Sequence, residues 1–319
     1  MKRNIVLDLL RLVLAFMVVG IHTHFLHDIS PVGSFLTVHG LFTIAVPVFL
    51  LISGFYMFPV LEKGEENKWI KRILIIYLVW MAFYAYKWLL DVPDYSIDSI
   101  SRVVHRFLFG YAHLWYIAGL LGATFLLKWM HRYASSSVMI ASVFITFLLG
   151  VFIEHINYWH LAQNSTLQTI FSFDWIYRNF LFVSYPFLAI GYLINRYSLH
   201  KKISIPSLLF FCVAGIGLIL MESYHNFQTH QTNSDNLLSI LFAAPVIFLL
   251  FMKLNVDGYT KKLALYAASI YFIHIFFVHV FEYLHIDLGE TLLTFVVYIL
   301  SAIASYFIVK LHERVPYIL

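Results

Sequence analysis

Long apolar runs separated by short polar segments make up the sequence from end to end. Runs of about 17–22 residues have the length that an α-helix needs to cross about 30 Å of hydrocarbon at 1.5 Å per residue. The pattern therefore predicts an all-α, polytopic integral membrane protein with about ten transmembrane helices. The expected spans are 5–25, 39–60, 73–90, 113–130, 136–153, 176–195, 206–222, 236–252, 263–281 and 290–309.

Lysine and arginine are distributed unequally between the two sets of segments that connect these spans. One set, with the two chain ends, carries Lys2, Arg3, Lys63, Lys68, Lys71, Arg72, Lys128, Arg132, Arg196, Lys201, Lys202, Lys253, Lys261, Lys262, Lys310 and Arg314. The opposite set carries only Lys87, Arg102, Arg106 and Arg178. Because cytoplasmic segments are enriched in positive charge, the first set is predicted to be cytoplasmic, which puts both termini on that side.

The composition supports a membrane protein over a water-soluble one. Hydrophobic residues make up 61% of the chain and charged residues only 12%, with a mean hydropathy of +0.81. A soluble domain of this size needs more surface charge. The longest segments outside the spans are 91–112, with a short amphipathic helix expected around Ile100–Leu108, and 154–175.

We therefore expect residues 1–319 to form a single transmembrane domain in the inner cell membrane, without a separate soluble domain. Its surroundings are membrane lipids, and nucleic acid is not an expected partner. The sequence leaves a homo-oligomer open, because lipid-facing and partner-facing apolar surfaces have the same composition.

Charged residues in the first span are the clearest candidates for function, because a charge inside a membrane costs about 2.5–3.5 kcal/mol. Asp8 and Arg11 are three residues apart, so they share a helix face and can pair. Arg11 and His22 are eleven residues apart, which is about three turns and about 16 Å along the same face. The structural alternative is that Arg11 extends back to the cytoplasm beside Asp8 and that His22 anchors the helix at the interface.

Histidines near the end of this span do not indicate a metal site. His22 and His24 lie on opposite sides of a helix, and no acidic or thiolate ligand accompanies them. We expect no metal. Elsewhere, His113, Arg178 and His274 stand in or near predicted spans, where an interface anchor or a packing residue is as good an interpretation as a catalytic one.

Several segments, taken together and in order, resemble the acyltransferase-3 family of membrane O-acyltransferases. The resemblance begins with Arg11, ten intervening residues and His22. It continues through Val46-Pro47-Val48-Phe49-Leu50-Leu51-Ile52-Ser53-Gly54-Phe55, Lys71-Arg72-Ile73-Leu74-Ile75, His113-Leu114-Trp115-Tyr116 and Ser269-Ile270-Tyr271-Phe272-Ile273-His274. The segment Arg178-Asn179-Phe180-Leu181-Phe182, followed by Pro186-Phe187-Leu188 and Gly191-Tyr192, is similar to the branch that contains surface-polysaccharide O-acetyltransferases.

The resemblance implies transfer of an acetyl group from cytoplasmic acetyl-CoA, as co-substrate, to a hydroxyl of a carbohydrate or a lipid-linked sugar. It implies that His22 is the general base and that Arg11, positioned by Asp8, orients the site or holds the donor. Lys71 and Arg72 are expected to meet the CoA phosphates, although basic residues at cytoplasmic helix ends are also explained by topology alone. The residues expected to shape the acceptor site are His113, Trp115, Tyr116, Arg178 and His274.

Three alternatives stay open at this point. The polar face of the first span suits a transporter or flippase as well, although no inverted repeat is visible. The same family fold also occurs fused to racemase domains, and no soluble racemase region is expected here. The third alternative is a sensor or scaffold without catalysis.

Overall fold

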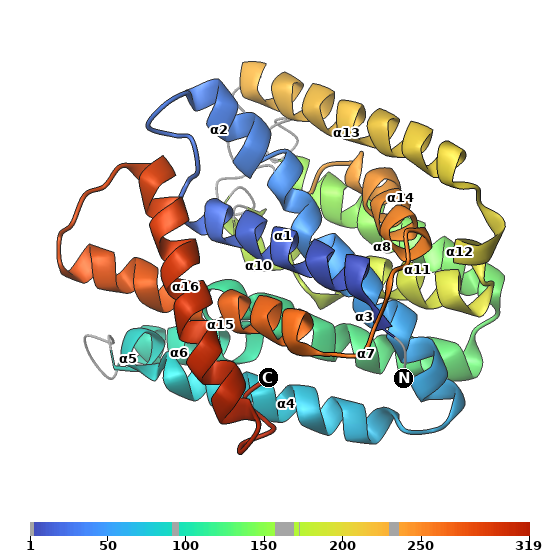
Figure 1. The fold of residues 1–319 in the computed structure, drawn as a ribbon, viewed down its shortest axis with the longest axis horizontal. Coiled ribbons are helices and arrows are strands. Elements are labelled where there is room, and N and C mark those ends of the chain that lie inside the picture. Colours follow the sequence, from blue (N-terminus) through green and yellow to red (C-terminus); the bar gives the residue numbers. More distant parts are fainter. Residues whose placement is uncertain (1–2, 91–95, 157–168, 172, 230–235) are drawn as a thin grey trace.

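The computed structural model describes residues 3–90, 96–156, 169–171, 173–229 and 236–319, and it is almost entirely helical (Figure 1). The first half contains β1 (Arg3–Asn4), α1 (Ile5–His22), α2 (Pro31–Val38), η1 (Leu41–Ile44), α3 (Ala45–Glu62), α4 (Glu66–Phe83), α5 (Ala85–Trp88), α6 (Ile97–Phe109), η2 (Ala112–Leu114), α7 (Trp115–Tyr133) and α8 (Ser136–His155). The second half contains α10 (Asp174–Tyr177), η3 (Phe180–Ser184), α11 (Tyr185–Arg196), α12 (Leu199–Lys202), α13 (Ile205–Gln228), α14 (Ile240–Lys253), β2 (Asp257–Gly258), α15 (Lys262–Tyr283) and α16 (Glu290–His312).

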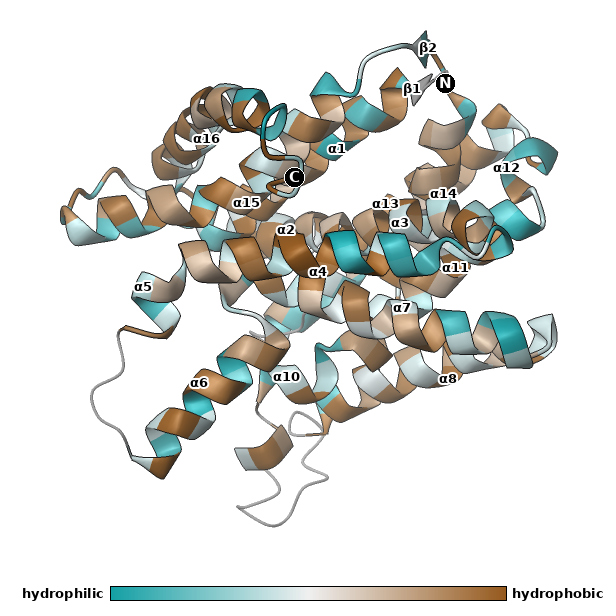
Figure 2. Ribbon diagram, turned by 90° about the horizontal axis from the view of Figure 1, so that it is seen from below, coloured by the Kyte–Doolittle hydropathy of each residue, from teal (hydrophilic) through white to brown (hydrophobic). Residues whose placement is uncertain are grey.

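Six helices of the described residues are long and apolar enough to cross a membrane. They are Ile5–His22, Pro31–Glu62, Ser136–His155, Ile205–Gln228, Lys262–Leu284 and Glu290–His312. The pair Ile97–Phe109 and Ala112–Tyr133, bent by 55°, adds a seventh if it is one span. Apolar residues run along most of the helices (Figure 2), and many large apolar side chains are exposed, as in a multi-pass membrane protein.

All ten predicted spans overlap helices, but ten crossings remain a prediction. Phe180–Arg196 and Ile240–Lys253 are shorter apolar helices. At 1.5 Å per residue the second of them extends about 21 Å, less than the hydrocarbon thickness of about 30 Å. The helix expected at 73–90 is α4, and its charged first turns keep it outside the set of clear spans.

Some predicted boundaries are wrong. α4 ends at Phe83, well before residue 90, and the chain continues into the short α5. The span expected at 176–195 is not continuous, because α10 ends at Tyr177 and a π-helical turn restarts the helix at Phe180. Arg178 therefore lies in the break between two helices. The amphipathic helix expected around Ile100–Leu108 is confirmed as α6.

Close packing of α3 against α11 forms the centre of the fold. A Cβ atom on Gly54 would lie 1.9 Å from the main-chain oxygen of Leu188, and one on Gly191 would lie 2.1 Å from that of Leu51. Only glycine allows the two backbones to approach this closely. The Ser53-Gly54 pair thus marks a tight helix contact.

α1 lies against this centre and also packs on α15 (Figure 1). Asn4 caps its first turn by accepting the Leu7 N–H at 3.1 Å, and the Asn4 amide donates to the main-chain oxygen of Phe251 at 3.1 Å. The antiparallel pairing of β1 with β2 holds the same end. The beginning of α1 is therefore fixed to the connection between α14 and α15.

Candidate functional site

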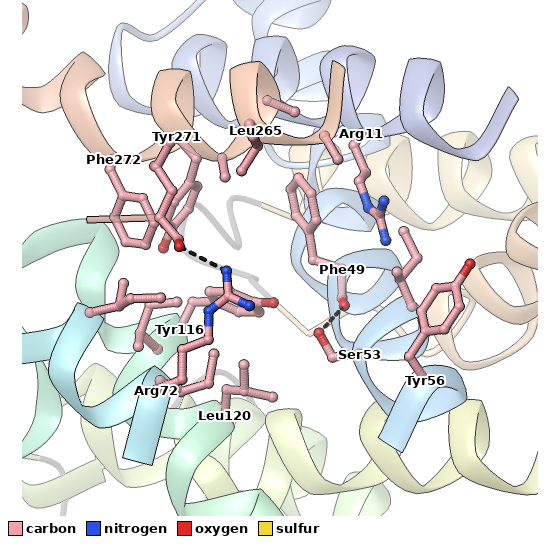
Figure 3. Close-up of a pocket in the computed structure, with 18 of the residues that line it drawn as sticks. Arg11, Phe49, Ser53, Tyr56, Arg72, Tyr116, Leu120, Leu265, Tyr271 and Phe272 are labelled. Atoms are coloured by element: carbon pink, nitrogen blue, oxygen red, sulfur yellow. Dashed lines mark hydrogen bonds between the residues drawn. The ribbon is translucent and has the colours of Figure 1, made fainter. Parts of the chain in front are cut away.

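The first cavity lies beside the N-terminal half of α1 and has a volume of about 410 Å³ (Figure 3). Its polar lining comes from α1, α3, α4, α7, α15 and the residue before α15, and includes Arg11, Ser53, Arg72, Tyr116, Lys261 and Tyr271. We call it the inner cavity, because the distribution of lysine and arginine predicts that this end of α1 is cytoplasmic.

Arg11 and Asp8 form an ion pair, as their spacing predicts. Asp8 is only 2% exposed, and Figure 3 shows the Arg11 guanidinium among the side chains that line the inner cavity. A buried carboxylate without a positive partner is strongly unfavourable, so the pair fixes Arg11 in this position. The structure thus supplies a permanent cation at the cavity wall.

Arg72 is on the inner cavity and is held there by the end of the described chain. Its guanidinium donates to the main-chain oxygen of Leu319 at 2.9 Å, and the indole of Trp80 donates to that of Ile318, also at 2.9 Å. Leu319 is itself buried against the cavity. Lys71, by contrast, is not one of the residues that line the cavity. The two expected phosphate contacts are therefore not equivalent.

The second cavity lies at the other end of α1 and is smaller, about 170 Å³. We call it the outer cavity. Its polar lining includes His22, Thr43, His113, Arg178, Asn236 and Tyr271. Arg178 lies 5.2 Å from the centre of the Trp115 ring and donates to Asp174 at 3.2 Å, which orients its positive charge at the cavity edge.

Three imidazole rings from distant parts of the chain gather at the outer cavity. The ring centroids of His22 and His274 are 5.3 Å apart, those of His113 and His274 are 4.9 Å apart, and those of His22 and His113 are 6.3 Å apart. His22 is partly exposed and lines the cavity, whereas His274 is fully buried behind it. Within the part of the chain that the structure describes, no group of three His, Cys, Asp or Glu side chains is arranged to hold a metal ion.

Local backbone conformation fixes His22 as the last residue of α1. His24 and Leu26 have positive φ angles of 55° and 66°, which a continuing right-handed helix does not allow. Thr23 then anchors the end of the helix, since its hydroxyl lies 2.6 Å from that of Thr294 in α16. The His22 side chain is therefore presented from a well-held helix end.

Tyr271 borders both cavities, and sequence reasoning did not select it as a site residue. Its hydroxyl donates to the main-chain oxygen of His113, and its ring centroid lies 5.7 Å from that of Tyr116. It is 6% exposed. The available signal was its position inside the Ser269–His274 segment, which drew attention for its histidine only.

The structure divides the predicted site residues between the two cavities. Arg11, Arg72 and Tyr116 line the inner cavity, and Asp8 pairs with Arg11. His22, His113, Trp115 and Arg178 line the outer cavity, with His274 directly behind. Tyr116 was expected to shape the acceptor site together with Trp115, but it lines the inner cavity instead, because consecutive helical residues point about 100° apart.

Comparison with known proteins identifies the family. The profile of the acyltransferase-3 family, described as an acyltransferase domain, matches residues 4–310. The chain belongs to this family. Membership indicates an acyltransferase with an acyl donor and an acceptor as substrates, and it fits a multi-pass membrane protein.

Curated relatives of this family member include racemases. A serine/alanine racemase from Enterococcus gallinarum is 27% identical over 267 residues, which cover 78% of this chain and 37% of that protein. An amino-acid racemase from Enterococcus faecalis is 26% identical over 263 residues, which cover 77% of this chain and 37% of that protein. The chain thus spans little more than a third of the length of these relatives. No solved structure matches it.

Proposed function

We propose that this chain is a membrane O-acyltransferase that moves an acetyl group from cytoplasmic acetyl-CoA to a hydroxyl of a surface polysaccharide or its lipid-linked sugar precursor. One observation carries the proposal. Two cavities at opposite ends of α1 share Tyr271 as a common wall; the inner one presents the cations Arg11, Arg72 and Lys261, while the outer one presents imidazoles beside Arg178.

The inner cavity suits the acyl donor. CoA carries several phosphate charges, and Arg11, Arg72 and Lys261 are three cations on this cavity. Guanidinium groups are suited to phosphate oxygens because they donate in a planar, forked geometry. A donor that enters from this side would point its thioester toward Tyr271 and the outer cavity.

The outer cavity suits the acceptor and the proton transfer. We assign His22 as the general base, because a neutral imidazole at the cavity edge can take the proton of an attacking hydroxyl near pH 7. The hydroxyl oxygen bonds to the thioester carbonyl carbon, the carbon–sulfur bond breaks, and the CoA thiolate leaves. The proton passes to His22 and then to the thiolate or to water.

The CoA thiol resembles that of cysteine, whose pKa is about 8.5. Its thiolate is therefore a good leaving group, and acid assistance at sulfur is not needed. In the alternative route His22 first takes the acetyl group from CoA as an acetyl-imidazole, and the acceptor hydroxyl then takes it from His22. The substrates and products are the same as in direct transfer. Arg178, held over Trp115, would orient a polar acceptor at the outer edge.

The experiment follows CoA release and acetylated product from the purified protein in lipid nanodiscs. Acetyl-CoA is supplied with a polysaccharide extract of the cells that produce the protein and, separately, with serine, because one relative is a serine/alanine racemase. We expect acceptor-dependent CoA release that falls by about 10²–10⁴-fold in His22→Ala, the usual contribution of a general base.

Acetyl-CoA binding separates the outcomes. His22→Ala should bind acetyl-CoA as the wild type does, because His22 is not on the inner cavity. A wild-type protein that shows no acetyl-CoA binding, by calorimetry or thermal shift, would refute the proposed donor. Turnover that survives in His22→Ala would refute the proposed base.

A further inference from the structure

The His274 imidazole is held in one orientation and one tautomer by the main chain of its own helix. Its Nδ1 atom lies 2.6 Å from the main-chain oxygen of Tyr271 and 3.3 Å from that of Ile270. A carbonyl oxygen only accepts hydrogen bonds, so Nδ1 must carry the proton. The other ring nitrogen, Nε2, is then left with a lone pair and can only accept.

This Nε2 atom has no hydrogen-bond partner among the residues that the structure describes, although His274 is fully buried. A buried acceptor without a partner is unfavourable, and most buried polar atoms in native proteins have one. The nearest imidazoles are those of His113 and His22. His274 therefore presents an unused acceptor to the histidine cluster.

The spacing between His274 and His22 fits a hydrogen bond between their rings. Two imidazoles joined by an N–H···N bond have centroids about 5 Å apart, given a donor–acceptor distance of about 2.9 Å. The observed separations are 5.3 Å to His22 and 4.9 Å to His113, so both rings are in range. His22 is the proposed base, and its side chain is partly exposed whereas that of His113 is buried, which leaves His22 freer to turn toward Nε2. The two rings are not hydrogen-bonded in the structure, so the bond requires the partly exposed His22 side chain to rotate toward Nε2 of His274.

We infer that His274 is a positioning residue that accepts one N–H of His22 and so leaves the other His22 nitrogen as the base in the outer cavity. The inference rests on the proposed function. In many hydrolases a carboxylate holds the base histidine in this way. Here a tautomer-locked imidazole takes that role, and it also accepts from the imidazolium that forms when His22 takes the proton of the acceptor.

Two substitutions separate this role from simple packing. His274→Gln keeps an acceptor oxygen near the position of Nε2, and His274→Leu keeps an apolar side chain of similar size without any acceptor. We expect His274→Leu to lower kcat by about 10–100-fold and to leave the acetyl-CoA KM within about twofold, since His274 does not line the inner cavity. His274→Gln should recover most of the lost kcat.

A spectroscopic measurement tests the inference without turnover. In protein labelled with ¹⁵N-histidine, solid-state NMR distinguishes the two imidazole tautomers, and His22 is assigned among the 16 histidines by its absence from His22→Gln. We expect a single His22 tautomer in the wild type and in His274→Gln, and a mixture of tautomers in His274→Leu.

The outcomes are distinct from those that test the proposed function. A mixture of His22 tautomers in the wild type, or a kcat in His274→Leu within twofold of the wild type, would overturn the inference even if the protein transfers acetyl groups. If His274→Leu does not fold, the wild-type spectrum and the His274→Gln kinetics still decide. A protein without acetyl-CoA turnover would refute the proposed function, and the NMR result would still report on the pairing.

Discussion

The inner and the outer cavity touch the same helix and the same tyrosine, yet their chemistry differs. The inner cavity is the larger and its charged groups are permanent cations, with Arg11 fixed by a buried aspartate. The outer cavity is the smaller, and it combines the imidazoles of His22 and His113, which carry no fixed charge, with the cation of Arg178 at its edge. Permanent cations hold an anionic ligand in place, whereas imidazoles exchange protons near pH 7. The difference separates a site suited to binding from a site suited to chemistry.

Among substitutions at the inner cavity, replacement of Arg11 should lower the stability of the protein most. Arg11→Gln leaves the carboxylate of Asp8 buried without its positive partner, which typically costs about 3–5 kcal/mol. Thermal unfolding in detergent should show a marked loss of stability. The double variant Asp8→Asn with Arg11→Gln should recover most of that stability and still bind acetyl-CoA weakly. If the double variant is as unstable as Arg11→Gln, the ion pair is not the cause.

Arg72 and Lys71 form a matched pair of adjacent cations on α4. Arg72 lines the inner cavity and Lys71 does not. Arg72→Ala should weaken acetyl-CoA binding by about tenfold, which corresponds to about 1.4 kcal/mol, while kcat at saturating donor stays nearly unchanged. Lys71→Ala should leave both quantities within about twofold. Equal losses in the two variants would indicate a general charge effect rather than a contact in the cavity.

Tyr271 tests whether the wall between the cavities matters. Tyr271→Phe keeps the ring and removes the hydrogen bond to the main-chain oxygen of His113, a bond worth about 0.5–1.5 kcal/mol. We expect kcat to fall by about two- to tenfold with an unchanged donor KM. The kinetics are measured as CoA release with acetyl-CoA and with butyryl-CoA. Tyr271→Ala, which removes the wall, should favour the longer acyl group relative to the wild type.

Substitution of Asp28 should have the smallest effect on stability and activity, because Asp28 lines neither cavity. Its carboxylate accepts the main-chain N–H of Thr291 at 3.1 Å and also the Thr291 hydroxyl, which joins the connection after α1 to the start of α16. The hydroxyl bond lowers the pKa of Asp28 below its ordinary value of 3.8. The contact therefore stabilises the fold fully above pH 3.8, and this stabilisation is lost as the pH falls through the lowered pKa.

Asp28→Asn should lower the unfolding temperature slightly at pH 7 and leave the kinetics unchanged. Unfolding temperatures of the variant and the wild type should converge below pH 3.8. A difference that persists at acidic pH would show that the contact does not depend on the ionised carboxylate.

Local spacing predicted those features of the site that depend on one helix. The pairing of Asp8 with Arg11 follows from three-residue spacing. The position of Arg11 and His22 at different cavities also follows from eleven residues of helical rise.

Contacts between distant segments could not be predicted from the sequence alone. Nothing local indicates that Tyr271 borders both cavities, or that Leu319 meets Arg72 across 247 positions of the chain. The unpartnered Nε2 atom of His274 is visible only once three helical segments are placed together. The break after Phe83 was missed because aromatic and apolar residues continue through it, and the break at Arg178 because apolar runs stand on both sides of the polar pair Arg178-Asn179.

Protection of introduced cysteines from a thiol reagent tests most directly whether the inner cavity, and not the outer one, binds the acyl donor. Cys212 is the one cysteine in the sequence, so a Cys212→Ser background allows single probes at Ser53→Cys, on the inner cavity, and at Thr43→Cys, on the outer cavity. The rate of reaction with a membrane-impermeant thiol reagent is measured from each side of oriented proteoliposomes, with and without saturating acetyl-CoA. The account predicts that the Ser53→Cys probe reacts from the cytoplasmic side and is protected by acetyl-CoA, whereas the Thr43→Cys probe reacts from the opposite side and keeps its rate. Protection of the Thr43→Cys probe without protection of the Ser53→Cys probe would contradict the assignment of the donor to the inner cavity.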